Sequence, residues 1–150
     1  MIDEIDPLEP TAITRVVICS GKVYYDLLDA RRKGELTHVA VVRIEQLYPF
    51  PLAELQAVFA RYPALKEVVW CQEEPQNQGA WYCSQHHFHD ALPAGISLRY
   101  AGRPASASPA VGYISLHLKQ QTAQTAEQLM RSRYSAFALQ QIDYILETTA

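Results

Sequence analysis

Residues 70–90, WCQEEPQNQGAWYCSQHHFHD, concentrate the side chains that can do chemistry. The stretch contains two cysteines, three histidines and three acidic residues within twenty-one positions. These residue types serve acid–base catalysis or metal binding when the fold brings them together. The spacing within the stretch decides which of these uses is open to it.

Cys83, His86 and His87 are spaced i, i+3 and i+4, so on a helix the thiol shares a face with either imidazole. A soft metal such as zinc accepts these ligands, but a closed site needs four of them. One helix supplies two or three ligands on one side, and His89 points roughly half a turn away from Cys83. A partly buried, aromatic-rich helix is therefore favoured over a metal site.

Glu73 and Glu74 are neighbours at the end of an expected strand, where successive side chains point in opposite directions. An acid–base pair needs two carboxyl groups that converge on a substrate, so these two alone do not form one. We expect them, with Asn77 and Gln78, to fix a turn or to face a partner surface. No Ser-His-Asp or Cys-His order is present, so no catalytic residue is assigned.

Ser20, Gly21 and Lys22 place a hydroxyl, a flexible residue and a cation between an expected strand and an expected helix. Backbone N–H groups at such a turn can hold a phosphate. The turn lacks the repeated glycines of nucleotide-binding fingerprints. An ordinary strand-to-helix turn is favoured over an anion site.

Short apolar runs alternate with helical patterns along most of the chain. Strands are expected over residues 15–21, 39–46, 66–74 and 96–103, and helices over 22–34, 51–63 and 79–92. Residues 1–14, with Pro7 and Pro10, are expected to be a linker, and a polar helix is expected from residue 115. This alternation predicts a mostly parallel sheet covered by helices on both faces, with ligands favouring the carboxyl ends of the strands.

The composition excludes several classes of protein. The formal net charge is −3, so no basic surface for nucleic acid or anionic membranes is indicated. No apolar run is long enough for a membrane span, and the acidic N-terminal stretch is unlike a signal peptide. Three cysteines without a CxxC pair are typical of a reducing compartment, and Cys19 and Cys71 are expected to be inert core thiols.

Four long motifs carry a resemblance to a known family: CSGKVYYDLL, VAVVRIEQLYPFP, VWCQEEPQNQGAWYCSQHHF and LRYAGRPASASPAVGY. Residues 5–121 resemble the C-terminal domain of the E1 component of bacterial 2-oxoglutarate dehydrogenase, an enzyme of the cytoplasm. The resemblance implies a three-layer α/β/α domain over 15–121, of the transketolase C-terminal type. It also implies a mostly parallel sheet of five strands.

The same resemblance implies a role in the tricarboxylic acid cycle. A whole E1 uses thiamine diphosphate and Mg²⁺ to decarboxylate 2-oxoglutarate, then passes the succinyl group to the lipoyl arm of the E2 succinyltransferase. The family marks its diphosphate- and metal-binding domain by a GDG motif, and this chain has no GDG. We therefore expect a structural domain that binds no cofactor, is inactive alone and packs against the catalytic domains of the E1 homodimer.

Candidate ligand or domain-interface residues are Ser20, Lys22, Gln46, Glu73, Glu74, Asn77, Gln78, Trp81 and Arg103. An alternative function is a stand-alone module that binds a nucleotide or an acyl-CoA at the crevice near these residues. Some actinobacterial relatives bind acetyl-CoA through a Gln, matched here by Gln46, and two arginines. Ala53 and Glu54 stand at the arginine positions, and a carboxylate there would repel phosphates.

The last 26 residues, TAEQLMRSRYSAFALQQIDYILETTA, depart from the E1 pattern. They resemble the start of the folded domain of YchJ-like proteins, which combine SEC-C and NTF2-like domains. Their apolar residues form an interrupted helical stripe, so residues 122–150 are expected to be a helical tail. Three fates are open to this stripe: docking on the α/β domain, pairing with another copy, or fraying; an exposed stripe would favour self-association. The sequence thus reads as a junction between two unrelated segments.

Overall fold

The computed structural model describes residues 1–103, 105 and 107. The order of elements is a 3-10 turn Pro10–Ala12, then β1 (Arg15–Cys19), α1 (Val23–Lys33), β2 (Val39–Arg43), α2 (Leu52–Ala60), β3 (Glu67–Pro75), α3 (Trp81–Ala91) and β4 (Ser97–Arg103). All seven strands and helices expected within this range are present, each within a few residues of its expected bounds. The helix expected from residue 115 and the tail over 122–150 lie outside the described residues.

The four strands form one parallel sheet in the order β2-β1-β3-β4. The chain winds outward from β1 to β2, then crosses back over β1 to add β3 and β4. The direction of winding therefore reverses between β1 and β3, which creates a topological switch point at that place. The predicted α/β class is confirmed with four strands; a fifth strand would have to come from residues outside the described range.

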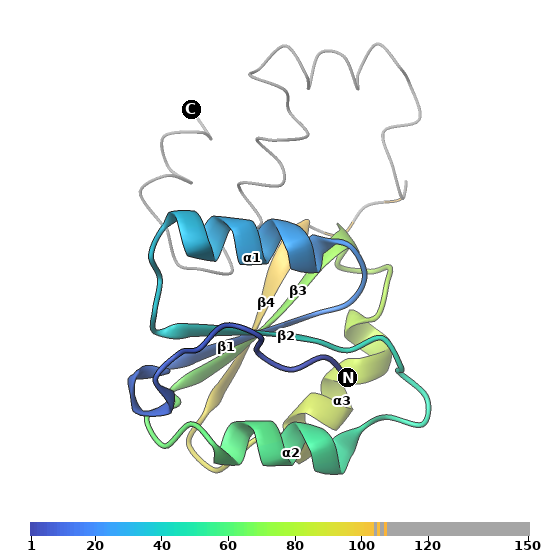
Figure 1. Ribbon diagram of the computed structural model, residues 1–150. Coiled ribbons are helices and arrows are strands. Elements are labelled where there is room, and N and C mark those ends of the chain that lie inside the picture. The colour runs from blue at the N-terminus through green and yellow to red at the C-terminus, as the bar shows by residue number, and fades with distance from the viewer. Residues whose placement is uncertain (104, 106, 108–150) are drawn as a thin grey trace, which may run out of the picture.

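Helix α1 covers one face of the sheet, and α2 and α3 cover the other (Figure 1). The alternation of side chains along β1 divides the interior between two cores. Val17 and Cys19 pack with α1, whereas Val16 and Ile18 pack with α2 and α3. Because β1 is a central strand, all five of its residues are buried, which explains its continuous apolar run.

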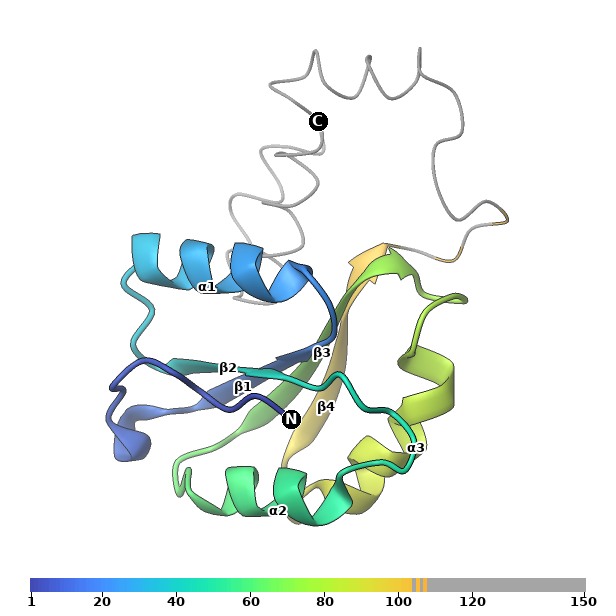
Figure 2. The same ribbon diagram turned by 45° about the vertical axis from the view of Figure 1, so that its right-hand side comes forward.

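Residues 1–14, described from the sequence as a linker, are held against the outer edge of β2 (Figure 2). Ile2 exchanges two backbone hydrogen bonds with Arg43, at 2.8 and 2.9 Å, in antiparallel orientation. A carboxylate oxygen of Glu4 accepts the backbone N–H of Val41 at 2.7 Å. The segment thereby covers backbone groups of an edge strand that would otherwise be open to another chain.

A buried arginine fastens this segment to α1. Arg31 is 2% exposed, and its guanidinium forms ion pairs with both Glu4 and Asp6. Arg32 adds two hydrogen bonds to Asp6, at 2.7 and 2.8 Å. Glu4 and Asp6 lie two residues apart in an extended segment, so both carboxylates reach the same side. Pro7 breaks regular structure as the sequence indicates, but the acidic residues before it anchor the chain.

Candidate functional site at the carboxyl ends of the strands

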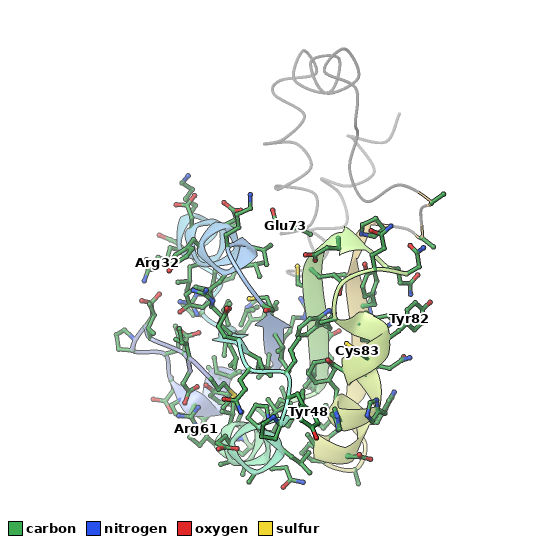
Figure 3. The ribbon with its side chains drawn as sticks, turned by 90° about the vertical axis from the view of Figure 1, so that its right-hand side faces the viewer. Arg32, Tyr48, Arg61, Glu73, Tyr82 and Cys83 are labelled. Atoms are coloured by element: carbon green, nitrogen blue, oxygen red, sulfur yellow. The ribbon has the colours of Figure 1, made fainter. Side chains whose placement is uncertain are left out.

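The strands end on one side of the sheet, and the polar candidates gather in the loops that follow. We call this region the carboxyl edge: residues 20–22, 44–51 and 72–80, the first turns of α1 and α3, and residues 1–2 beside the end of β2. Figure 3 looks onto this side of the molecule and labels Glu73, Tyr48 and Tyr82 on it. In parallel α/β sheets this is the side where ligands bind.

The turn between β1 and α1 is closed by the chain's own carboxylate. Gly21 has φ +74°, and its N–H donates to the carboxylate of Glu45 at 2.8 Å. Glu45 also pairs with Arg43, and this bond together with the Gly21 bond lowers the pKa of the Glu45 carboxyl. A phosphate bound at this N–H would have to displace Glu45, so the arrangement favours an ordinary turn here.

Lys22 and Glu73 bring together the two loops on either side of the switch point. The Lys22 Nζ lies 3.9 Å from a carboxylate oxygen of Glu73, and the lysine side chain is 66% exposed. An exposed pair of this kind contributes little to stability. Glu74 points toward Gly79 instead, so the two neighbouring glutamates diverge as their adjacent positions predict.

Gln72 organises the loop between β3 and α3. Its side chain is buried, and its amide oxygen accepts from the indole N–H of Trp70 at 2.8 Å and from the Trp81 N–H at 3.1 Å. Its amide nitrogen donates to the carbonyls of Pro75 at 3.1 Å and Gln78 at 2.7 Å. One side chain therefore caps the start of α3 and fixes the turn that precedes it.

Gly79 completes this turn because its left-handed backbone conformation and its close neighbours disfavour a larger residue. Its φ is +65°, and a Cβ at this position would lie 3.0 Å from the Gln72 Nε2 and 3.1 Å from a Glu74 carboxylate oxygen. Trp81 follows as the first residue of α3 and packs its ring 5.3 Å from that of Tyr100. The polar loop thus leads directly into a packed pair of aromatic rings.

The other candidates do not converge on a common point. Gln46 donates to the Pro49 carbonyl within its own loop at 3.1 Å, and Ser20 is half-buried in the β1–α1 turn. Asn77 is exposed, and the Gln78 N–H donates to the Pro75 carbonyl at 2.8 Å. Arg103 ends β4, paired in register with Pro75. The positions share an edge, and the bonds of Gln46 and of the Gln78 N–H stay within their own loops.

The thiol and the imidazoles of α3 likewise do not form a common site. Cys83 is exposed, with its Sγ 3.2 Å from the Ala80 carbonyl one turn earlier. His87 stacks on Phe50 with ring centroids 4.6 Å apart, and the His86 ring lies 3.9 Å from that of His87. Within residues 1–103, no group of three or more His, Cys, Asp or Glu side chains is arranged to hold a metal ion. His87 packs the helix against the β2–α2 loop.

The remaining two thiols lie in the core, as expected. Cys19 and Cys71 are fully buried, face each other in register on β1 and β3, and remain free thiols. Burial raises the pKa of both groups, that of Cys71 to about 12. Neither thiol is suited to nucleophilic chemistry at neutral pH.

Glu45 and Gln72 are the residues that hold the edge together, and sequence reasoning does not single them out. Both belong to polar clusters at strand ends, which is the available signal. What the sequence does not show is that Glu45 reaches across to the neighbouring loop, and that Gln72 turns inward from a strand.

Comparison with known proteins identifies the family. The family model described as "2-oxoglutarate dehydrogenase C-terminal" matches residues 1–129. The chain belongs to this family. A second model, "YchJ, middle NTF2-like domain", matches residues 125–150. The two matches meet at residues 125–129, where the sequence changes character.

Curated relatives of the 2-oxoglutarate dehydrogenase family are E1 components from bacteria. The Haemophilus influenzae E1 component is 60% identical over 121 residues, which cover 81% of this chain and 13% of the relative. The Azotobacter vinelandii E1 component is 58% identical over 124 residues, again covering 81% of this chain and 13% of the relative. The chain therefore spans about an eighth of the length of the E1 proteins it matches.

A solved structure shares the fold of this 2-oxoglutarate dehydrogenase C-terminal domain. It is described as "Split gene transketolase, inactive beta4 tetramer" and aligns with a TM-score of 0.57 over 85% of this chain and 38% of its own. The sequence identity is 18%, so the likeness concerns the fold alone. It agrees with the expected transketolase-like α/β fold. Among the described residues, none of the helices is long and apolar enough to span a membrane.

Proposed function

We propose that this chain is a structural domain of a thiamine diphosphate-dependent 2-oxoglutarate dehydrogenase E1, and that it has no decarboxylase activity alone. One observation carries the proposal. The chain is 60% identical to a segment that makes up 13% of a bacterial E1 component, and the matching family model is named for the C-terminal region. The partners are then the catalytic domains of the E1 homodimer and, through the complex, the E2 succinyltransferase. The five-stranded sheet that the family resemblance implies belongs to the same proposal.

The donor set at the carboxyl edge supports this role. Thiamine diphosphate with Mg²⁺ requires oxygen ligands that converge on the metal and donors for the diphosphate. Here Glu73 and Glu74 diverge, and Glu45 occupies the Gly21 N–H. The described residues do not fit this cofactor, so no step of its chemistry is assigned to them.

The alternative, a nucleotide or acyl-CoA binding module, has less support. Its anion would meet Glu45 at the β1–α1 turn and Glu54 in the first turn of α2, and both are carboxylates. Lys22, the cation nearest the switch point, already faces Glu73. Calorimetry of the chain against AMP, acetyl-CoA and thiamine diphosphate separates the two functions, because the structural role predicts no binding heat for any of them.

The direct test is an assay of the purified chain with 2-oxoglutarate, thiamine diphosphate, Mg²⁺ and an artificial electron acceptor. The Haemophilus influenzae E1 component, assayed in parallel, serves as the positive control. The structural role predicts turnover by the control and none by the chain. Turnover by the chain at a rate comparable to the control would contradict the proposal.

A further inference from the structure

Exposed large apolar side chains are unevenly distributed over the described part of the molecule. They are Met1, Ile2, Ile5, Tyr25, Tyr48 and Tyr82, with exposed fractions between 40 and 92%. Five of the six lie at the carboxyl edge, with Ile5 the exception.

Each of the three strand-to-helix regions carries one of the tyrosines. Tyr25 lies in the first turn of α1, Tyr48 in the β2–α2 loop and Tyr82 in the first turn of α3. Tyr48 is 92% exposed and Tyr82 55% exposed, and Figure 3 shows both on the side where the strands end. Tyrosine is enriched in protein interfaces because it combines a large apolar ring with a hydroxyl that can remain hydrogen-bonded.

The charged groups among these rings are paired within the domain. Arg43 lies 5.5 Å from the centroid of the Tyr25 ring and donates to its hydroxyl at 3.3 Å. The same guanidinium pairs with Glu45. A partner that covers this region would therefore bury aromatic rings without leaving these charges unpaired, which is the costly event in interface formation.

The path of the chain indicates which partner approaches this edge. Ile2 is fixed to Arg43, the last residue of β2, by two backbone hydrogen bonds. Met1 therefore lies at the carboxyl edge. In a full-length E1, the polypeptide that precedes the C-terminal region joins the domain at this position, and it accounts for most of the relative's length.

The geometry points to the carboxyl edge, through Tyr25, Tyr48 and Tyr82, as the surface that packs against the preceding domains of an E1 polypeptide. This inference rests on the proposed function and adds the location of the contact. The edge of the sheet that binds ligands in many α/β proteins is used here for protein–protein contact.

The test uses a full-length chimera in which this chain replaces the matching C-terminal segment of the Haemophilus influenzae E1 component. A photo-crosslinking phenylalanine analogue is placed at Tyr48 or at Tyr82. Matched controls carry it at Thr37 or Ala94, which are exposed in loops at the opposite ends of the strands. A second chimera that ends at Gln121 repeats the experiment without the YchJ-like segment.

We expect the analogue at Tyr48 or Tyr82 to crosslink to the preceding domains of the same or the partner subunit. The analogue at Thr37 or Ala94 should give no such crosslink. Crosslinks from Thr37 and Ala94 but not from the tyrosines would overturn the inference, as would tyrosine crosslinks confined to residues 104–150. In either case a chimera that assembles and turns over leaves the proposed function intact. Failure of both chimeras to assemble would contradict both the inference and the proposed function.

Discussion

The carboxylate of Glu4 accepts the backbone N–H of Val41 at 2.7 Å, so a side chain takes the place of a neighbouring strand at the edge of β2. The same carboxylate pairs with Arg31, whose guanidinium is almost fully buried. The residues before β1 are therefore part of the folded domain, and their energetics can be tested.

Replacing Arg31 by Met should destabilise the chain by about 3–5 kcal/mol, because it leaves Glu4 without its charged partner in a buried setting. The matched change, Arg32→Met, removes a side chain that is 53% exposed and should cost less than about 1 kcal/mol. Urea denaturation of both variants measures the difference. Equal losses would show that the N-terminal segment is not held through Arg31.

The stability of the chain should fall in acid through Asp6. Hydrogen bonding to Arg32, aided by Arg31, lowers the pKa of Asp6 to about 2, whereas an unfolded aspartate titrates near 4. The folded chain binds this proton less readily than the unfolded chain. The stabilisation by Asp6 is therefore present above about pH 4 and is lost as the pH falls toward 2.

The variant Asp6→Asn tests the direction of this pH dependence. Its unfolding free energy should be lower than that of the parent at pH 6 and should depend less on pH between 4 and 2. Urea midpoints measured across this range give both quantities. A parent and variant with parallel pH profiles would show that Asp6 does not contribute through its charge.

Gln72→Leu should cost about 3 kcal/mol, because it removes the partners of the Trp70 indole and the Trp81 N–H in a buried site. Gln76→Leu is the matched control, since it makes the same chemical change in the same loop at a half-buried position. Its effect should stay within about 0.5 kcal/mol. Comparable losses in the two variants would contradict the role assigned to Gln72.

The strands and helices follow from the sequence because burial leaves a pattern in it. β1 is a nearly continuous apolar run, and α1 repeats apolar residues such as Leu27 and Leu28 on one face. Turn chemistry is less readable. Gly34 is the expected stop of α1, yet the left-handed residue is Glu35, with φ 51°. The bonds from Glu35 N–H to Arg32 and from Leu36 N–H to Arg31 close a Schellman motif one residue later than expected.

The site was harder to predict for a related reason. Polar residues after strand ends mark the carboxyl edge correctly, but side-chain direction depends on packing. Gln72 turns inward to satisfy buried backbone groups, and Glu45 crosses to Gly21. Nothing in the spacing of these residues specifies that they bond to the chain's own backbone and not to a ligand.

The three cysteines should differ sharply in reactivity. Cys83 is exposed, whereas Cys19 and Cys71 are buried and their pKa values are raised. With a chromogenic disulfide reagent at pH 8, one thiol per chain should react rapidly and the other two only after unfolding. Cys83→Ser should abolish the rapid phase. A rapid phase that survives in this variant would contradict the burial of the β1 and β3 thiols.

The most direct measurement of the structural role is turnover of 2-oxoglutarate by the full-length chimera, compared with the isolated chain and with the Haemophilus influenzae E1 component truncated before its matching segment. The account predicts turnover by the chimera and none by the chain or the truncated protein. Turnover by the isolated chain, or undiminished turnover by the truncated protein, would contradict it.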